Sequence, residues 1–428
     1  MSNLEKGNYT LVGSREDEQE QANIADSKDT DKVVPKSSMW QSVCNLVSDV
    51  EGTGLLALPY VVQRGGVVAI AALVIVPFIC YYTGKILIYC LYIKDNNDQK
   101  IRIRSNYKDM GEASWPRYGG VFVVTMQVVE LSLLASLYLV LCGSLLYGIL
   151  PGVPVPERVW MLIAALVGLP TLFVRHLSYI AWISLLSVIA LTIAVFIILG
   201  YGATTSPHWD INSIPLLDVE GTPIALAIII FSYICHPVLP TVEANMIDPK
   251  QFNVMLALTY MAVFAIKIVF ALFGFLTFSS NIKEVITNSI PSGTVQIVVN
   301  SFLVLNVMFS YPFRVITLIH CIEDSVVTEQ FRSRFSDISW SITVRVVVNF
   351  VTLIPAIAIP HFALMMSFVA SLTGMFMVFV LPCTFHLCLE SKLRWHDKVL
   401  DYFIITFGIL AGGIGLVVSV VDMTAAFR

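Results

Sequence analysis

The stretch Asn45-Leu-Val-Ser-Asp-Val-Glu-Gly-Thr-Gly-Leu-Leu-Ala-Leu-Pro-Tyr60 decides the fold, because it puts two carboxylates and a Gly-Thr-Gly turn inside an apolar span. Five spans later, Phe231-Ser-Tyr-Ile-Cys-His-Pro-Val-Leu-Pro240 is interrupted in the same way. An unpaired backbone group in a bilayer costs several kcal/mol, so helix-breaking sequence at mid-depth is tolerated only where it lines a cavity or packs inside protein. Two broken helices in corresponding positions therefore predict a substrate site at the membrane midplane.

The composition indicates an all-α polytopic membrane protein. Hydrophobic residues make up 57% of the chain and charged residues 13%, with a mean hydropathy of +0.78. A soluble protein of this composition has no place for its apolar surface. Because a spanning helix needs about 20 apolar residues, we predict eleven spans, at 41–62, 66–92, 119–150, 158–174, 180–201, 222–240, 252–278, 295–322, 340–359, 362–387 and 399–424.

The distribution of Lys and Arg outside these spans predicts the orientation, since cytosolic loops carry an excess of both. An N-terminus in the cytosol leaves only Arg64, Arg158, Lys283 and Arg428 on the other side. The C-terminus is then lumenal or external. The cytosolic set is larger: Lys94, Lys100, Arg102, Arg104, Lys108, Arg117, Arg175, Lys250, Arg332, Arg334, Lys392, Arg394 and Lys398.

Residues 1–38 are polar and nearly free of aromatic residues, which predicts a disordered cytosolic tail. No positively charged and apolar leader precedes the first span, so we expect no cleavable signal peptide. Within the tail, Tyr9-Thr-Leu-Val12 has the form that vesicle coat adaptors bind, although a merely solvated tail explains it equally well. The one Asn-x-Ser/Thr sequon, at Asn8, lies in this tail, so the lumenal loops are expected to be unglycosylated.

Several function classes are disfavoured. A net charge of −4 gives no indication of nucleic acid binding. The eight cysteines lie within or beside spans without metal-ligand spacing, so we expect no disulfide and no metal site. Hydrolase, metalloprotease and phosphate-binding motifs are missing, so the chain is not expected to be an enzyme or to need a cofactor other than an ion gradient.

Ionisable residues within the spans are candidates for transport chemistry, because each needs a partner, a water-filled cavity or a proton. Glu51, Glu130 and Lys267 fall near the same depth, with Asp49 slightly nearer the cytosol. We predict that Glu130 carries a proton, since a buried carboxylate binds one more readily than an exposed carboxylate. The alternative is a permanent ion pair with Lys267, whose role is expected to be structural, and Arg314 is expected to snorkel to the cytosolic surface.

The glycine break predicts an anion site. Gly52, Thr53 and Gly54 would leave backbone N–H groups free at the start of the outer half-helix, where the dipole favours a substrate carboxylate. Close helix packing is the alternative use of these glycines. Asp49 and Glu51 beside the break should attract a substrate amine and share one proton, which favours a zwitterion over a dicarboxylate.

The second break offers two further candidates. Tyr233 is predicted to contact the substrate through its hydroxyl or its ring. His236, directly before Pro237, either titrates at vesicular pH or is satisfied by carbonyls that the break frees.

The two interrupted spans, together with several shorter runs of sequence, resemble the vesicular members of the amino acid/auxin permease family, over a region from about Trp40 through the eighth span. The resemblance implies a LeuT-type fold of two inverted five-helix repeats plus an eleventh helix, and loading of GABA and glycine into vesicles in exchange for protons. It supports Glu130, Tyr233 and Asn45 as pocket or coupling positions. The residues that carry it are Leu58-Pro-Tyr60, Gly65-Gly66, Cys80-Tyr-Tyr-Thr-Gly-Lys-Ile-Leu-Ile-Tyr-Cys-Leu-Tyr92, Val129-Glu-Leu131, Phe231-Ser-Tyr233, Leu239-Pro240, Glu243-Ala-Asn-Met246, Lys283-Glu-Val-Ile-Thr-Asn288 and Ser310-Tyr-Pro312.

Three positions depart from that family pattern. Asp49 and Glu51 stand where uncharged residues are expected, and His236 stands where a glutamine is expected. Extra negative charge in the first broken helix repels a substrate carboxylate unless it is protonated or paired with the substrate amine.

We therefore expect a proton-coupled exchanger of zwitterionic amino acids in the vesicle membrane. A proton-coupled symporter of the plasma or lysosomal membrane is the alternative, and a channel or transporter-derived receptor is a third reading from another class. The expected organisation is a tail at 1–38, a first repeat at 39–201, a lumenal loop at 202–221, a second repeat at 222–390, and a cytosolic loop with the eleventh helix at 391–428.

Overall fold

The computed structural model describes residues 36–94, 100–150, 152–173, 177–205, 209–323, 336–390 and 392–426. The adaptor-like Tyr9–Val12 and almost all of the expected tail lie outside these residues. Residues 36–38, which the sequence assigned to the tail, are described: Ser38 caps the first helix in a reciprocal capping box with Gln41.

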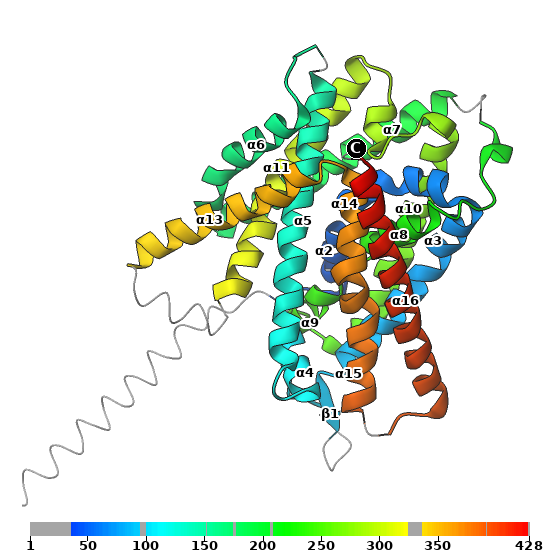
Figure 1. The fold of residues 1–428 in the computed structure, drawn as a ribbon. Coiled ribbons are helices and arrows are strands. Elements are labelled where there is room, and N and C mark those ends of the chain that lie inside the picture. Colours follow the sequence, from blue (N-terminus) through cyan, green and yellow to red (C-terminus); the bar gives the residue numbers. More distant parts are fainter. Residues whose placement is uncertain are drawn as a thin grey trace, which may run out of the picture.

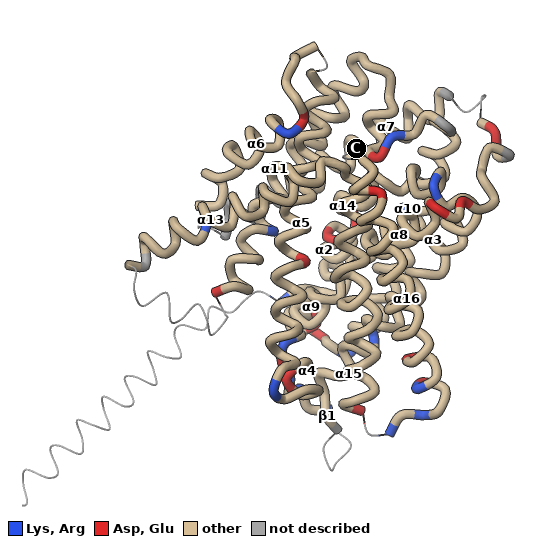
Figure 2. Tube along the Cα trace, in the orientation of Figure 1, with Lys and Arg blue, Asp and Glu red and all other residues tan. Residues whose placement is uncertain are grey.

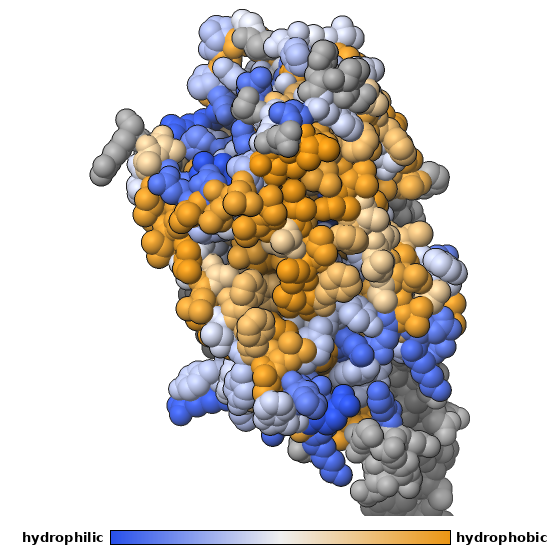
Figure 3. Space-filling view, turned by 90° about the vertical axis from the view of Figure 1, so that its right-hand side faces the viewer, coloured by the Kyte–Doolittle hydropathy of each residue, from blue (hydrophilic) through white to orange (hydrophobic). Residues whose placement is uncertain are grey.

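The described residues form a bundle of helices with one small β-hairpin (Figure 1). Seen from the side, a wide apolar band separates two polar ends (Figure 3). Lys, Arg, Asp and Glu gather at those ends and are sparse between them (Figure 2). Large apolar side chains such as Phe196, Ile354 and Val417 are 69%, 67% and 63% exposed, as expected for helices that are surrounded by lipid. The chain is an all-helical polytopic membrane protein.

Nine helical segments within the described residues are long and apolar enough to cross a membrane. All eleven expected spans coincide with helical segments, but the count of eleven is not confirmed, because α2 and α6 have 12 residues each. The helices are α2 (Met39–Val50), α3 (Leu58–Tyr89), α4 (Tyr107–Ser114), α5 (Gly119–Ile149), α6 (Glu157–Gly168), α7 (Leu177–Thr205), α8 (Thr222–Ser232), α9 (Leu239–Ala244), α10 (Phe252–Phe278), α11 (Thr294–Glu323), α13 (Asp337–Ala358), α14 (Phe362–Val369), α15 (Leu381–Leu389) and α16 (Trp395–Ala426).

Both predicted helix breaks are present. The helix α2 ends at Val50, and a 3-10 turn, η1 (Thr53–Ala57), leads directly into α3. The helix α8 ends at Ser232, and a second 3-10 turn, η5 (His236–Val238), leads into α9. Glycine in the first break and proline in the second remove the helical preference at the positions where each helix stops.

The first two expected spans are separated by a backbone kink rather than a loop. Gly66 has a φ of +56°, inside a segment that is otherwise helical from Leu58 to Tyr89. A Cβ there would lie 1.9 Å from the Pro215 carbonyl oxygen, and that carbonyl accepts a hydrogen bond from the Val67 N–H at 3.0 Å. Only glycine fits this conformation and this approach.

The helix pair α14 and α15 is joined through two π-helical turns, η9 (Ala370–Gly374) and η10 (Phe376–Val380). Wide turns of this kind occur frequently at functional sites. A Cβ on Gly374 would lie 2.7 Å from the Ile234 Cδ1, so this irregular segment packs against the second helix break.

One polar end carries the hairpin of β1 (Tyr92–Lys94) and β2 (Lys100–Arg102), together with α4 and the α15 end (Figure 1). Glu243 of α9 is 1% exposed there, accepts a hydrogen bond from the Tyr92 hydroxyl and pairs with Arg102 at 3.2 Å. The pKa of Tyr92 is raised to about 12 by burial and by this carboxylate.

The segment before α2 is joined to the segment after α9 by main-chain hydrogen bonds. The Ser37 N–H donates to the Asn245 carbonyl at 2.8 Å, and the Ile247 N–H donates to the Ser37 carbonyl at 3.0 Å. The inner halves of the two broken helices are thus linked at this polar end.

Candidate functional site

The two helix breaks meet at Lys267 of α10. The Lys267 Nζ donates to the Val50 carbonyl at 3.1 Å and also to the Ser232 carbonyl, so it contacts the last residue of each broken helix. It lies 4.6 Å from the centroid of the Tyr233 ring, within the range of a cation–π contact. Residues more than 180 positions apart in the sequence are therefore neighbours at one ammonium group.

Glu51, the residue after Val50, is buried without a hydrogen-bond partner. Its side chain is 8% exposed, and neither carboxylate oxygen accepts a hydrogen bond from the described residues. It interacts electrostatically with Lys267. A buried carboxylate with unused acceptors is costly unless it binds a proton or a cationic group. The site is therefore suited to a ligand amine.

The glycines of the first break have different surroundings. A Cβ on Gly54 would lie 3.0 Å from the Ser232 Cα, so Gly54 allows α8 to pack closely, as the packing alternative expected. A Cβ on Gly52 would meet only the Asp49 carbonyl oxygen at 3.6 Å and the Tyr138 hydroxyl at 3.8 Å. Gly52 therefore borders less crowded space than Gly54 does.

The helical run Thr53–Tyr89 begins without a side-chain cap at Gly52. The first N–H groups of a helix have no partner within the helix and carry partial positive charge. This helix start adjoins the Glu51 carboxylate in the sequence, and Thr53 and Gly54 are buried with it. An acceptor for an amine and donors for a carboxylate thus lie next to each other.

Asp49 is not free to pair with a substrate in this structure. Its carboxylate accepts a hydrogen bond from Arg314 of α11 at 2.8 Å, and the two side chains are 27% and 17% exposed. The expectation that Arg314 snorkels to the surface is wrong, because a charged partner lies within the bundle. Arg314 also interacts electrostatically with Tyr138 of α5, whose hydroxyl borders Gly52.

Glu130 of α5 is 7% exposed, and the cation with which it interacts electrostatically is Arg314. The alternative of a permanent ion pair between Glu130 and Lys267 is therefore wrong, because Lys267 contacts the two helix-end carbonyls instead. The charged residues expected at a similar depth therefore form two clusters, one around Lys267 and Glu51 and one around Arg314. The role of Glu130 as a proton carrier stays a prediction.

The remaining candidates take other positions. The Tyr233 hydroxyl donates to the Leu73 carbonyl at 3.4 Å, and its ring faces the ammonium of Lys267. His236 is fully buried, with Nε2 2.9 Å from the Thr83 hydroxyl of α3, and it also interacts with the backbone of Cys80. Asn45 lies on an exposed part of α2.

Sequence reasoning missed Tyr138 and Thr83, and it gave Arg314 the wrong surroundings. Tyr138 lies two helical turns after Glu130 on α5, a spacing that places both toward a similar side of the helix. Thr83 lies within the Tyr-Thr-Gly-Lys-Ile-Leu-Ile run that carried the family resemblance.

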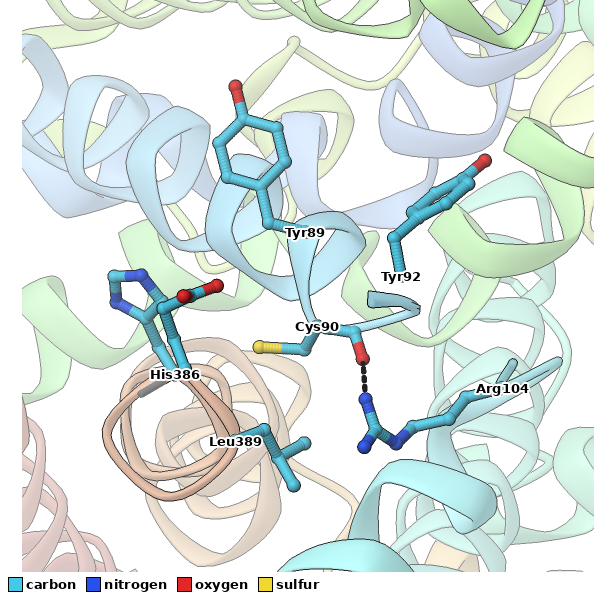
Figure 4. Close-up of a pocket in the computed structure, with 7 residues that line it drawn as sticks. Tyr89, Cys90, Tyr92, Arg104, His386 and Leu389 are labelled. Carbon is cyan, nitrogen blue, oxygen red and sulfur yellow. Dashed lines mark hydrogen bonds between the residues drawn. The ribbon is translucent and has the colours of Figure 1, made fainter. Parts of the chain in front are cut away.

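A separate small pocket lies at the polar end that holds the hairpin (Figure 4). It is lined by Tyr89, Cys90, Tyr92, Arg104 and His386, together with Leu389 and Glu390. Arg104 donates to the Cys90 carbonyl at 2.6 Å across it. None of the candidate site residues lines this pocket.

Comparison with known proteins agrees with a transport site. Residues 35–421 match the family model described as transmembrane amino acid transporter protein. The chain is 35% identical to the vesicular inhibitory amino acid transporter of Xenopus tropicalis over 408 residues, covering 92% of this chain and 79% of that protein. It is 34% identical to the Homo sapiens protein of that name, covering 92% and 78%. It is 30% identical to the vesicular GABA transporter of Caenorhabditis elegans, covering 87% and 77%.

Two solved structures share the fold. A closed, bromovinylhydantoin-bound structure of Mhp1, a nucleobase-cation-symport-1 family transporter, aligns with a TM-score of 0.52 at 13% identity, covering 92% of this chain and 93% of that one. An outward-open, substrate-bound structure of a Na+-coupled sialic acid symporter aligns with a TM-score of 0.50 at 10% identity, covering 89% and 90%.

Proposed function

The chain belongs to the transmembrane amino acid transporter protein family, and from this premise we propose that it loads small zwitterionic amino acids, such as GABA or glycine, into vesicles in exchange for protons. It is a membrane transporter of amino acids and not an enzyme. The relatives named as vesicular transporters of inhibitory amino acids and of GABA support the substrate class and the vesicle membrane.

One observation carries the substrate assignment. Neither oxygen of the buried Glu51 carboxylate accepts a hydrogen bond from the part of the chain that the structure describes, and Glu51 lies two residues before the uncapped start of the helical run Thr53–Tyr89. The carboxylate binds the substrate amine, and the N–H groups that follow Gly52 bind the substrate carboxylate. A second substrate carboxylate would meet the Glu51 charge without a partner, so glutamate and aspartate are excluded.

Proton coupling is assigned to Glu130. It is buried in α5 and interacts electrostatically with Arg314. In the exchange cycle Glu130 takes up a lumenal proton after the substrate leaves and releases it toward the cytosol before the next substrate binds. Asp49 neutralises Arg314 during the cycle, so that the proton on Glu130 is not displaced permanently by the guanidinium.

Access alternates through movement of the broken helices. Substrate sites at helix breaks are reached from one side at a time when one bundle rocks against the other. The proposed orientation puts the N-terminus and the hairpin in the cytosol and the C-terminus in the lumen. The sequence Tyr9–Val12 is then available to vesicle coat adaptors, and the bilayer, protons and a small amino acid are the remaining partners.

Uptake by the purified full-length protein in proteoliposomes tests this function. Labelled GABA, glycine, alanine and glutamate are offered with a pH gradient, and separately with an imposed voltage. An acidic interior should drive accumulation of GABA or glycine and not of glutamate. Accumulation driven by an acidic exterior instead would establish a symporter, and currents far above carrier turnover would establish a channel.

A further inference from the structure

Lys267 lies where two helix C-termini converge. Its Nζ donates to the Val50 carbonyl at 3.1 Å and to the Ser232 carbonyl, the terminal residues of α2 and α8. The side chain is 0% exposed. The ring of Tyr233 covers the ammonium at 4.6 Å.

Carbonyls at such a position are ligands for a cation. Each helix C-terminus carries about half a negative charge, and the carbonyls of unwound half-helices coordinate Na+ or protons in transporters with broken helices. Here two helix ends face the same point, and the unpartnered carboxylate of Glu51 interacts electrostatically with the group that fills it. The chain therefore holds a cation site in which the cation is covalently attached.

We infer that Lys267 is a built-in cation that replaces a bound metal ion at the junction of the broken helices. Substrate transport consequently requires neither Na+ nor K+, because the positive charge that holds Val50 and Ser232 together never dissociates. Shortening the Lys267 side chain leaves a cavity lined by two carbonyl oxygens and near Glu51, which binds a small monovalent cation. The statement about transport rests on the proposed function, and the statement about cation binding does not.

The contacts of Lys267 distinguish this role from an ordinary buried ion pair. In an ion pair, the ammonium would donate to a carboxylate, but the Glu51 oxygens accept no hydrogen bond from any described residue and Glu130 interacts electrostatically with Arg314. The ammonium is bound by carbonyl oxygens, the ligand type of an alkali cation site. Glu51 thereby keeps its acceptors for a ligand.

Thermal unfolding of the purified full-length protein tests cation binding without any transport measurement. The wild type, Lys267→Ala and Lys267→Met are compared in NaCl, KCl and choline chloride at equal ionic strength. The wild type and Lys267→Met, whose apolar side chain fills the space, should unfold at the same temperature in all three salts. Lys267→Ala should be stabilised by Na+ or K+ relative to choline by roughly 2 to 5 °C.

Propylammonium provides a sharper probe, since it matches the atoms that Lys267→Ala removes. It should raise the unfolding temperature of Lys267→Ala, whereas neutral propanol at the same concentration should not. If Lys267→Ala does not fold, Lys267→Gln, which is shorter and uncharged, is measured in the three salts instead. A folded variant that responds to none of the cations would overturn the inference, and so would specific stabilisation of the wild type by Na+.

Proteoliposome uptake provides the transport measurement. With a pH gradient fixed, replacing Na+ by choline should leave wild-type uptake unchanged. A wild type that transports amino acids only in Na+ contradicts the inference and leaves the proposed function standing. A wild type that carries no amino acid contradicts the proposed function, and the unfolding measurements then still decide the role of Lys267.

Discussion

Replacing Glu51 and Asp49 separately tests whether the first helix break recognises the substrate amine. Both substitutions, Glu51→Gln and Asp49→Asn, exchange a carboxylate for an amide of the same shape within three residues of sequence. The two carboxylates differ in their contacts, because Asp49 accepts a hydrogen bond from Arg314 at 2.8 Å, whereas Glu51 has no hydrogen-bond partner among the described residues. Each variant therefore serves as the matched control for the other.

The expected magnitudes follow from these contacts. A hydrogen bond between a buried carboxylate and a substrate ammonium contributes about 1.5–3 kcal/mol, so Glu51→Gln should raise KM by roughly 10- to 150-fold. It breaks no hydrogen bond to a described residue, but it removes the negative charge that interacts with the buried Lys267 ammonium, so the unfolding temperature should fall modestly. Asp49→Asn weakens a partly buried charged pair and should lower the free energy of unfolding by about 1–2 kcal/mol, with a smaller effect on KM.

The assay combines initial rates of labelled GABA and glycine uptake at varied concentration with thermal unfolding of the same preparations. Quantifying the protein in each proteoliposome batch separates a change in KM from a loss of folded carrier. A well-folded Glu51→Gln protein with the wild-type KM would refute the amine site. Robust glutamate uptake by the wild type would do so as well, because a second substrate carboxylate should be repelled.

Three further predictions concern coupling, the glycine break and pH. Glu130→Gln should lose pH-driven uptake and keep substrate binding, since an amide preserves the shape of the side chain without releasing a proton. Counterflow exchange without a gradient measures the retained binding. An unchanged pH dependence of uptake would mean that Glu130 has a structural role. Gly54→Leu should abolish uptake and also lower the yield of folded protein, because the new side chain would clash with the backbone of α8. In Gly52→Ala the new Cβ would meet no atom closer than 3.6 Å, so this variant should fold normally while its uptake is weakened. A larger folding defect in Gly52→Ala than in Gly54→Leu would contradict this packing. The Glu284 carboxylate, 3.6 Å from the His361 Nδ1, raises the pKa of His361 above its ordinary value of 6.5. The stabilisation from this pair is therefore complete below pH 6.5 and is lost as the pH rises through the raised pKa. The unfolding temperature should fall as the pH rises above 6.5, and Glu284→Gln should flatten that profile.

Features set by local backbone chemistry were predictable from the sequence. Glycine at 52 and 54 and proline at 237 disfavour the helical backbone conformation at their own positions, so the two helix breaks could be located directly from the sequence, as could the long apolar helices. The membrane class and the family resemblance likewise rest on composition and on contiguous runs of residues.

Partners distant in sequence were not predictable. Asp49 and Arg314 are 265 positions apart, and a similar depth in the membrane does not say which charges face each other. Depth alone suggested that Glu130 and Lys267 could pair, but helix rotation turns one toward Arg314 and the other toward two carbonyls. The carbonyl ligands of Lys267 leave no mark in the amino-acid sequence, because every residue has a carbonyl group.

The main-chain bridge between Ser37 and the segment after α9 has a mechanical consequence. It couples the movement of α2 to that of α9, so neither inner half-helix can move outward alone while these main-chain hydrogen bonds persist. Opening at this end of the molecule then requires either that both half-helices move together or that the hydrogen bonds of Ser37 break first. Any modification or adaptor that pulls on the chain just before Ser37 would act on both half-helices at once.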